Sequence, residues 1–221
     1  MKVAIATVQV PFITGGAEIL TGMLCDELKK RGHQADVVTL PFKWYPAQSL
    51  YNCMLSGRML DLTEVNGEKI DKVIAMKFPA FYVNHPNKTV WLMHQHRQAY
   101  DLWGTQYGDI QNWKNGREVR RMIWQNDTKY LSEARAVYTI AGNTSKRLYR
   151  YNGLESTVLY HPPLGWEKMH CEGYGDTIFY PSRIDPMKRQ RRIVEAARYV
   201  KSGVRFVLAG SGAESEMNYL R

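Results

Sequence analysis

The sequence has 221 residues, of which 44% are hydrophobic and 23% charged, and these proportions exclude an intrinsically disordered chain. The formal net charge of +9 favours an anionic partner, such as a phosphorylated substrate, an anionic membrane or nucleic acid. No apolar run approaches the roughly 18 residues of a membrane-spanning helix. The 3 cysteines form no CxxC pair, which argues against a disulfide framework or a zinc site and fits a reducing, cytoplasmic compartment.

Strand-like and helical patterns alternate through the first part of the chain. Residues 3–10 predict a buried strand of a parallel sheet, and residues 17–31 predict a helix. A strand at residues 36–40 completes a unit with the size and order of a βαβ crossover. Further helices are expected at residues 47–60, 115–134 and 144–151, and further strands at 72–76, 89–93, 137–141 and 157–160. Asn143 or Thr144 is the expected cap of the last of these helices.

The pattern is interrupted once and then restarts. Residues 1–163 form the predicted Rossmann-like domain, and residues 164–176, which lack periodicity, form the predicted linker. A second βαβ unit follows, with strands at 177–180 and 205–209, a helix at 190–200, and a further helix beginning after the glycine turn at 210–212. Because so few elements cannot bury both faces of a parallel sheet, we expect residues 177–221 to be the start of an incomplete domain.

Two adjacent glycines, Gly15 and Gly16, lie between the first predicted strand and the first predicted helix. Glycine allows a backbone to approach a ligand closely, and a helix N-terminus offers free N–H groups with a partial positive charge. A phosphate or a sugar hydroxyl would suit this turn, although a purely structural tight turn is an equal alternative. The dinucleotide fingerprint G-x-G-x-x-G is absent, which disfavours NAD.

Two histidines follow the strand predicted at residues 89–93, at the sheet edge where α/β proteins bind ligands. His94 and His96 have no further metal ligands at suitable spacing. A hydrogen-bonding or proton-handling role is therefore expected for His94. For His96 we favour a packing role.

The second βαβ unit contains two strand-to-helix loops with ligand-binding potential. Arg183 and Lys188, five positions apart in the first loop, are suited to contact one diphosphate, the arginine with a forked contact and the lysine as a point charge. Gly210 and Gly212 form a turn in the second loop that is able to pass close to a ligand. Solvated helix faces are the alternative explanation for the basic residues.

The order of these motifs resembles the retaining glycosyltransferases of the GT-B fold, family four, also called group 1 glycosyltransferases. The resemblance extends over essentially the whole chain: GGAE after the first strand, a histidine in mid-domain, an S-R-x-x-x-x-K loop, and then L-A-G-S-G-x-E. It implies two facing Rossmann-like domains with the active site in the cleft. The first domain would bind mainly the acceptor and the second mainly the nucleotide sugar.

The resemblance also implies roles for individual residues. Gly15 and Gly16 would meet the phosphate or sugar of the donor, and His94 would lie beside the transferred sugar. Arg183 and Lys188 would neutralise the diphosphate leaving group. Gly210 and Gly212 would belong to the same donor-binding loops, and Glu18, Arg97 and Arg117 are expected on the acceptor side. The family transfers the sugar with retention of configuration and without a metal, so the nucleotide sugar is a co-substrate and no cofactor is expected.

The sequence departs from the family pattern in two places. Ser182 precedes the loop arginine where many relatives have glycine, a small change. The paired glutamates that contact the donor in the family would come after Arg221. We therefore expect a chain truncated within its second domain and inactive by itself.

The acceptor is expected to be a saccharide or a lipid-linked precursor of a cell-surface polysaccharide or glycolipid. The loops at residues 45–60 and 99–114 are expected to select it, and the basic residues Lys114, Arg117, Arg120 and Arg121 are expected to touch an anionic membrane peripherally. One alternative is a sugar-nucleotide epimerase of the same fold. The other is a non-catalytic basic module for nucleic acid, which is disfavoured because no recognition motif is present.

Overall fold

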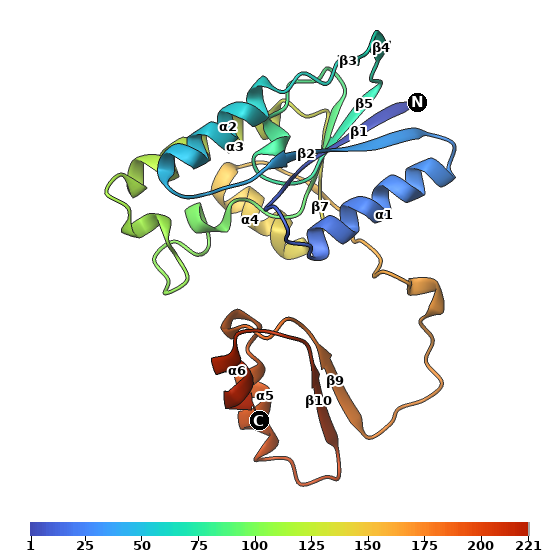
Figure 1. Ribbon diagram of the computed structural model, residues 1–221, viewed down its shortest axis with the longest axis vertical. Helices are drawn as coiled ribbons and strands as arrows, with labels where there is room; N and C mark the ends of the chain where they lie inside the picture. The colour runs from blue at the N-terminus through green and yellow to red at the C-terminus, as the bar shows by residue number, and fades with distance from the viewer. Residues whose placement is uncertain (221) are drawn as a thin grey trace. The chain divides into compact units, whose positions relative to one another are not determined.

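The computed structural model describes residues 1–220. It contains two compact units, unit 1 from Met1 to Trp166 and unit 2 beginning at Glu167 (Figure 1). No helix in the described part of the chain is long and apolar enough to cross a bilayer.

Unit 1 is built on a parallel six-stranded sheet with the strand order β2-β1-β5-β6-β7-β8. The strands are β1 (Lys2–Gln9), β2 (Gln34–Pro41), β5 (Lys72–Ala75), β6 (Lys88–Leu92), β7 (Ala136–Thr139) and β8 (Thr157–Val158). The helices are α1 (Gly16–Lys30), α2 (Ala47–Met59), α3 (Gly116–Ser132) and α4 (Gly142–Asn152). The sheet and its flanking helices confirm the predicted Rossmann-like α/β character.

Helices cover both faces of this sheet because its strands are apolar on both sides. Ala4, Ala6 and Val8 of β1 belong to the larger core cluster, together with residues of α2 and α3. Val3 and Ile5, which point to the opposite face, pack in a second cluster with α1. Figure 1 shows this arrangement, with α1 on one side of the sheet and α2 and α3 on the other.

Short elements complete unit 1. They are the hairpin β3 (Glu64–Val65) and β4 (Glu68–Lys69), and the 3₁₀ turns η1 (Ala80–Tyr82), η2 (Arg97–Ala99), η3 (Ile110–Asn112) and η4 (Trp166–Lys168), the last of which extends into unit 2. This hairpin was not predicted from the sequence. Its signal was the Asn66-Gly67 pair, since both residues have the positive φ that a tight hairpin turn requires.

The expected cap of α4 was wrong. The helix begins at Gly142, and Ala141 is its N-cap residue. Thr144 is buried inside the first turn, where its hydroxyl donates to the carbonyl of Met93 at 3.5 Å. Thr144 therefore hydrogen-bonds to the loop after β6 and does not cap the helix, and the N-cap residue is Ala141.

Unit 2 contains the parallel strands β9 (Thr177–Pro181) and β10 (Arg205–Ala209), the turn η5 (Pro186–Lys188), and the helices α5 (Gln190–Ala197) and α6 (Glu214–Leu220). Phe206 and Leu208 of β10 line an apolar cavity of about 420 Å³ together with residues of α5 and α6. Ile178 and Phe179 of β9 are exposed. The strands and helices agree with the predicted second βαβ unit, except that α5 ends three residues early.

Candidate functional site at the carboxyl edge of the unit 1 sheet

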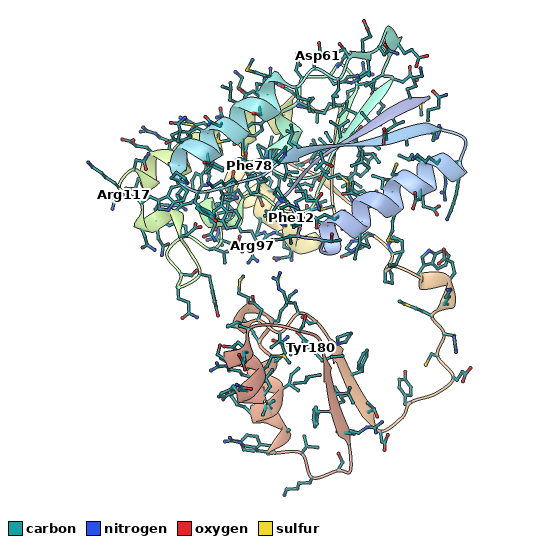
Figure 2. All side chains as sticks on the ribbon, in the orientation of Figure 1. Phe12, Asp61, Phe78, Arg97, Arg117 and Tyr180 are labelled. Atoms are coloured by element: carbon teal, nitrogen blue, oxygen red, sulfur yellow. The ribbon has the colours of Figure 1, made fainter. Side chains whose placement is uncertain are left out.

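The loops that follow β1, β5 and β6 lie at one edge of the sheet, because the carboxyl ends of parallel strands share an edge. They bring together Gly15 after β1, Lys77 after β5 and His94 after β6. Helix α4, which follows β7, begins at the same edge. Figure 2 shows Phe12 and Arg97 on this side of unit 1, where α1 also begins.

An ion pair links the first two of these loops. Lys77 Nζ lies 3.0 Å from Glu18 Oε1, and both side chains are largely buried. The other carboxylate oxygen of Glu18 accepts the backbone N–H of Gly15 at 2.9 Å. Burial by itself would raise the pKa of Glu18, but the hydrogen bond and charge of Lys77, aided by Gly15, lower it overall. Both oxygens of this carboxylate, for which an acceptor-side role was expected, thus have partners inside the chain.

The two glycines of this turn are not required by the protein's own packing. Gly15 has an extended backbone, which any residue adopts. A Cβ on Gly15 would make only an ordinary contact with Glu18, and a Cβ on Gly16 would meet no atom within 4 Å. The open space beside Gly16 is the room that a ligand would need at the N-terminus of α1.

The imidazole of His94 is exposed at this edge. Its Nδ1 lies 2.7 Å from the carbonyl oxygen of Gln95. A proton on Nδ1 donates to that carbonyl and leaves Nε2 as a free acceptor. Desolvation by the surrounding protein lowers the pKa of His94, and the positive charges of Lys77, Arg147 and Arg97 lower it further. The neutral imidazole is therefore the stable form near pH 7.

One acidic residue partly balances these cations. Asp101 accepts two hydrogen bonds from Arg97, at 3.0 and 2.7 Å, and one from Arg147 at 3.1 Å. The same two guanidinium groups lower the pKa of Asp101 against the opposing effect of burial. Two arginines share one carboxylate, so this part of the edge keeps a positive charge that suits an anionic or hydroxyl-rich ligand.

His96 packs inside the protein. Its ring stacks on Phe78 with centroids 5.1 Å apart and meets Phe42 edge-on at 6.0 Å. Burial lowers the pKa of His96 to about 3, and its Nε2 has no hydrogen-bond partner among residues 1–220. The ring therefore behaves as an aromatic core residue.

An aromatic groove of about 560 Å³ lies next to the loop that carries the glycines. It is lined by the segment after β1, the segment after β2 and polar residues of α2, namely Val10, Pro11, Ile13, Pro41, Phe42, Lys43, Trp44, Tyr45, Ser49, Asn52 and Cys53. Phe12 in the same loop is fully exposed and has a φ of 66°, a conformation that costs free energy for a bulky residue. Trp44 is held in place because its indole N–H donates to Asp109 at 2.9 Å.

In unit 2, Arg183 and Lys188 lie in the loop between β9 and α5, and both side chains are exposed. Neither the guanidinium nor the ammonium group has a hydrogen bond or ion pair within residues 1–220. The loop itself is ordered by local bonds. Asp185 caps η5 by accepting from the backbone of Met187, and Gln190 donates to the carbonyl of Arg183 at 2.8 Å. Two free cations thus project from a fixed loop.

Gly210 and Gly212 are explained by close backbone packing. A Cβ on Gly210 would clash with the carbonyl oxygen of Ser182, and one on Gly212 would clash with that of Ile184. The backbone N–H of Ile184 donates to the carbonyl of Ser211 at 2.8 Å. These glycines hold the turn after β10 against the loop after β9, whether or not a ligand binds.

Four residues of the unit 1 edge were not predicted from the sequence: Lys77, Asp101, Arg147 and Phe12. The signal for Lys77 was present, because it follows a predicted strand directly. Arg147 had none, since it lies inside a helix and reaches the edge only through the fold. The expected acceptor-side residues Arg97 and Arg117 are not brought together, and Figure 2 shows them well apart.

Comparisons with known proteins identify no family for this chain. No protein-family model matches this sequence, and no curated protein matches it. Within residues 1–220, no group of three or more His, Cys, Asp or Glu side chains is placed to hold a metal ion.

Proposed function

We propose that this chain is part of an enzyme that transfers a sugar from a nucleotide-diphosphate sugar to an acceptor. In that reaction the bond from the anomeric carbon to the diphosphate breaks, and the nucleoside diphosphate leaves with the electron pair. The acceptor hydroxyl forms the new bond to the anomeric carbon and releases its proton. The proposal includes retention of configuration, by analogy with the family that the motif order resembles.

The observation that carries the proposal is the pair of free cations in unit 2. Arg183 and Lys188 project from a strand-to-helix loop whose backbone is fixed by its own hydrogen bonds. A leaving diphosphate gains negative charge as its bond to the sugar breaks, and preorganised cations stabilise that charge. Cations already paired with a carboxylate would be far less able to do so.

Unit 1 supports the proposal with a site suited to hydroxyl groups. The free Nε2 of neutral His94 is an acceptor for one sugar hydroxyl. The open backbone beside Gly16 gives the donor room to approach the helix N-terminus. The aromatic groove, which contains Trp44 and Tyr45, offers rings on which an acceptor saccharide or the apolar part of a lipid-linked acceptor packs.

Calorimetric titration of the full chain with UDP, GDP, ADP and the corresponding sugar nucleotides tests this proposal. We expect one nucleoside diphosphate to bind, and Arg183→Ala and Lys188→Ala each to weaken binding about tenfold, because each removes a charge-assisted contact. At 100 times its dissociation constant, the ligand should stabilise the protein by about 2.7 kcal/mol.

Arg192→Ala and Lys201→Ala are matched controls, because these exposed cations lie in the same unit outside the loop. They should bind the nucleotide like the unchanged protein. Equal losses in the control and loop variants, or no binding of any nucleotide, would refute the proposal. If turnover is observed, product analysis separates sugar transfer from conversion of the nucleotide sugar itself, which would indicate an epimerase.

A further inference from the structure

A second basic site lies on unit 1, formed by α3 and the loop before it. It is a pocket of about 320 Å³ lined by two tryptophans and three arginines, namely Trp103, Trp124, Arg117, Arg120 and Arg121. Figure 2 shows Arg117 at the outer end of unit 1, apart from Arg97 at the carboxyl edge of the sheet. The pocket shares no lining residue with the candidate site described above.

Arg120 is fixed at the centre of this pocket. Its guanidinium lies over the rings of Trp103 and Trp124, at 4.5 and 4.4 Å from their centroids. Its Nε donates to the carbonyl of Ala99 at 2.9 Å, and the indole N–H of Trp124 donates to the same oxygen at 2.8 Å. The terminal nitrogens of Arg120 remain available, in an orientation that the two rings and the carbonyl have already set.

The other two arginines bring further unpaired charge. Arg117 and Arg121 are one turn apart on the exposed side of α3, and neither forms an ion pair or hydrogen bond within residues 1–220. Glu118 lies between them in sequence but pairs with neither. Three guanidinium groups without a carboxylate repel one another, so the pocket favours an anion.

We propose that this pocket binds a phosphate group, the chemistry shared by a phospholipid headgroup and a free phosphate ester. The fork of each arginine matches phosphate oxygens, and the tryptophan rings provide an apolar wall for the body that carries the phosphate. The proposal does not rest on sugar transfer, since none of the residues that line this pocket has a part in the reaction proposed above.

Two probes test the proposal and distinguish the sources of the phosphate. Glycerol 3-phosphate supplies the free ester, and vesicles of phosphatidylglycerol in phosphatidylcholine supply the headgroup at a surface. We expect saturable binding of at least one probe by the full chain. The Arg117→Gln/Arg121→Gln double variant should weaken it about tenfold or more, because two charged contacts are lost.

The variant pair was chosen to keep the fold intact. Arg120 anchors α3 to Ala99, so its substitution risks unfolding, whereas the side chains of Arg117 and Arg121 form no hydrogen bond or ion pair within residues 1–220. The matched control is Lys69→Gln/Lys72→Gln, which removes the same charge at the amino end of the sheet. The control should bind like the unchanged protein, and circular dichroism should show both variants folded.

The outcomes are distinct. Loss confined to the arginine variant supports the proposal, and the probe that binds identifies the source. Binding of neither probe, or an equal loss in both variants, overturns it. Saturable binding of single-stranded RNA with no binding of either phosphate probe also overturns it, in favour of nucleic acid.

Discussion

Desolvation is the main effect that lowers the pKa of His94, three cations around the ring act in the same direction, and the hydrogen bond to the Gln95 carbonyl opposes them. Lys77 comes from the loop after β5, Arg147 from α4 and Arg97 from η2. Each disfavours a positive charge on the imidazole, and desolvation acts in the same direction. The ring is thus kept neutral with a free acceptor nitrogen.

An NMR titration of the histidine rings measures the pKa of His94 and so tests this protonation state. We expect the pKa of His94 to lie below its ordinary value of 6.5, and Arg147→Gln to raise it because one nearby positive charge is removed. His94→Gln identifies the signal. Lys72→Gln, at the amino end of the strands, should leave the pKa unchanged; an equal rise there would show that the effect is not local.

The most deeply buried acidic group of unit 1 is Asp127. Its carboxylate accepts from Tyr82 at 2.6 Å and from Tyr100 at 2.7 Å. Burial raises the pKa of Asp127 to about 7, although both tyrosine hydrogen bonds act to lower it. The folded state therefore holds a proton that the unfolded state releases at a lower pH, and the stabilisation from this proton is lost as the pH rises through about 7.

Asp127→Asn should remove this pH dependence. Between pH 5 and pH 8, the unfolding free energy of the variant relative to the unchanged protein should rise by about 2–3 kcal/mol. Urea unfolding followed by tryptophan fluorescence measures it in unit 1 alone, since all 6 tryptophans lie in residues 1–166. Asp26→Asn, at an exposed position on α1, should show no such rise. A flat difference for Asp127→Asn would contradict the assignment.

At the scale of elements, a buried lysine joins β6 to the segments that pack on it. Lys88 is almost inaccessible to solvent, and its ammonium donates to the carbonyls of Phe81, Val83 and Tyr130 at 3.2, 3.1 and 2.8 Å. These carbonyls lie at the ends of η1 and α3, where backbone oxygens lack helical partners. Desolvation lowers the pKa of Lys88 to about 8, against the opposing charge of Glu133.

Lys88→Met should destabilise unit 1 by about 2–4 kcal/mol, because three buried carbonyls lose their donor. The midpoint of urea unfolding, again by tryptophan fluorescence, measures this change. Lys72→Met on the neighbouring strand is the control, and it should alter stability by less than about 0.5 kcal/mol. If the two variants were equally stable, Lys88 would not hold these elements together.

At the scale of the whole molecule, the chain is two compact units joined through a segment with little secondary structure. Residues 169–176 after η4 are exposed and contain no helix or strand. A segment of this kind, with few contacts, opens to a protease more readily than a packed helix does. The predicted linker, residues 164–176, contains the observed boundary between the units.

Brief digestion with a glutamate-specific protease should therefore cut first at Glu167 or Glu172. Mass spectrometry should find an early fragment of residues 1–167 or 1–172 that survives further digestion. Glu64 and Glu68 in the exposed hairpin are the internal control, since they are equally accessible but held in a turn. A first cut in the hairpin would contradict this view of the boundary.

Much of the fold was predictable because local patterns and the tertiary structure agree. The apolar strands and the helices α1 and α2 lie within a few residues of their predicted positions. The hairpin at Asn66-Gly67 was also available from its dipeptide. The cap of α4 was not predictable, because the hydroxyl of Thr144 donates to the carbonyl of Met93 in another loop.

The candidate site was predictable only in part, for a related reason. Residues that follow strands, such as Gly15, His94 and Lys77, can be placed at one edge by the rule for parallel sheets. Residues such as Arg147 and Asp101 reach the site from elements whose orientation the sequence does not state. The pairing of Glu18 with Lys77 joins positions 59 residues apart, and only the fold brings them within 3.0 Å.

The sequence by itself determined the alternation of strands and helices, the two-unit organisation and the positions where strands end, because hydrophobic period and turn residues are local properties. The tertiary structure decided which charges remain free. It paired Glu18 with Lys77 and Arg147 with Asp101, and within residues 1–220 it left the side chains of Arg183, Lys188, Arg117 and Arg121 without a hydrogen bond or ion pair. Ion pairing depends on distance in space, and no local pattern contains that distance.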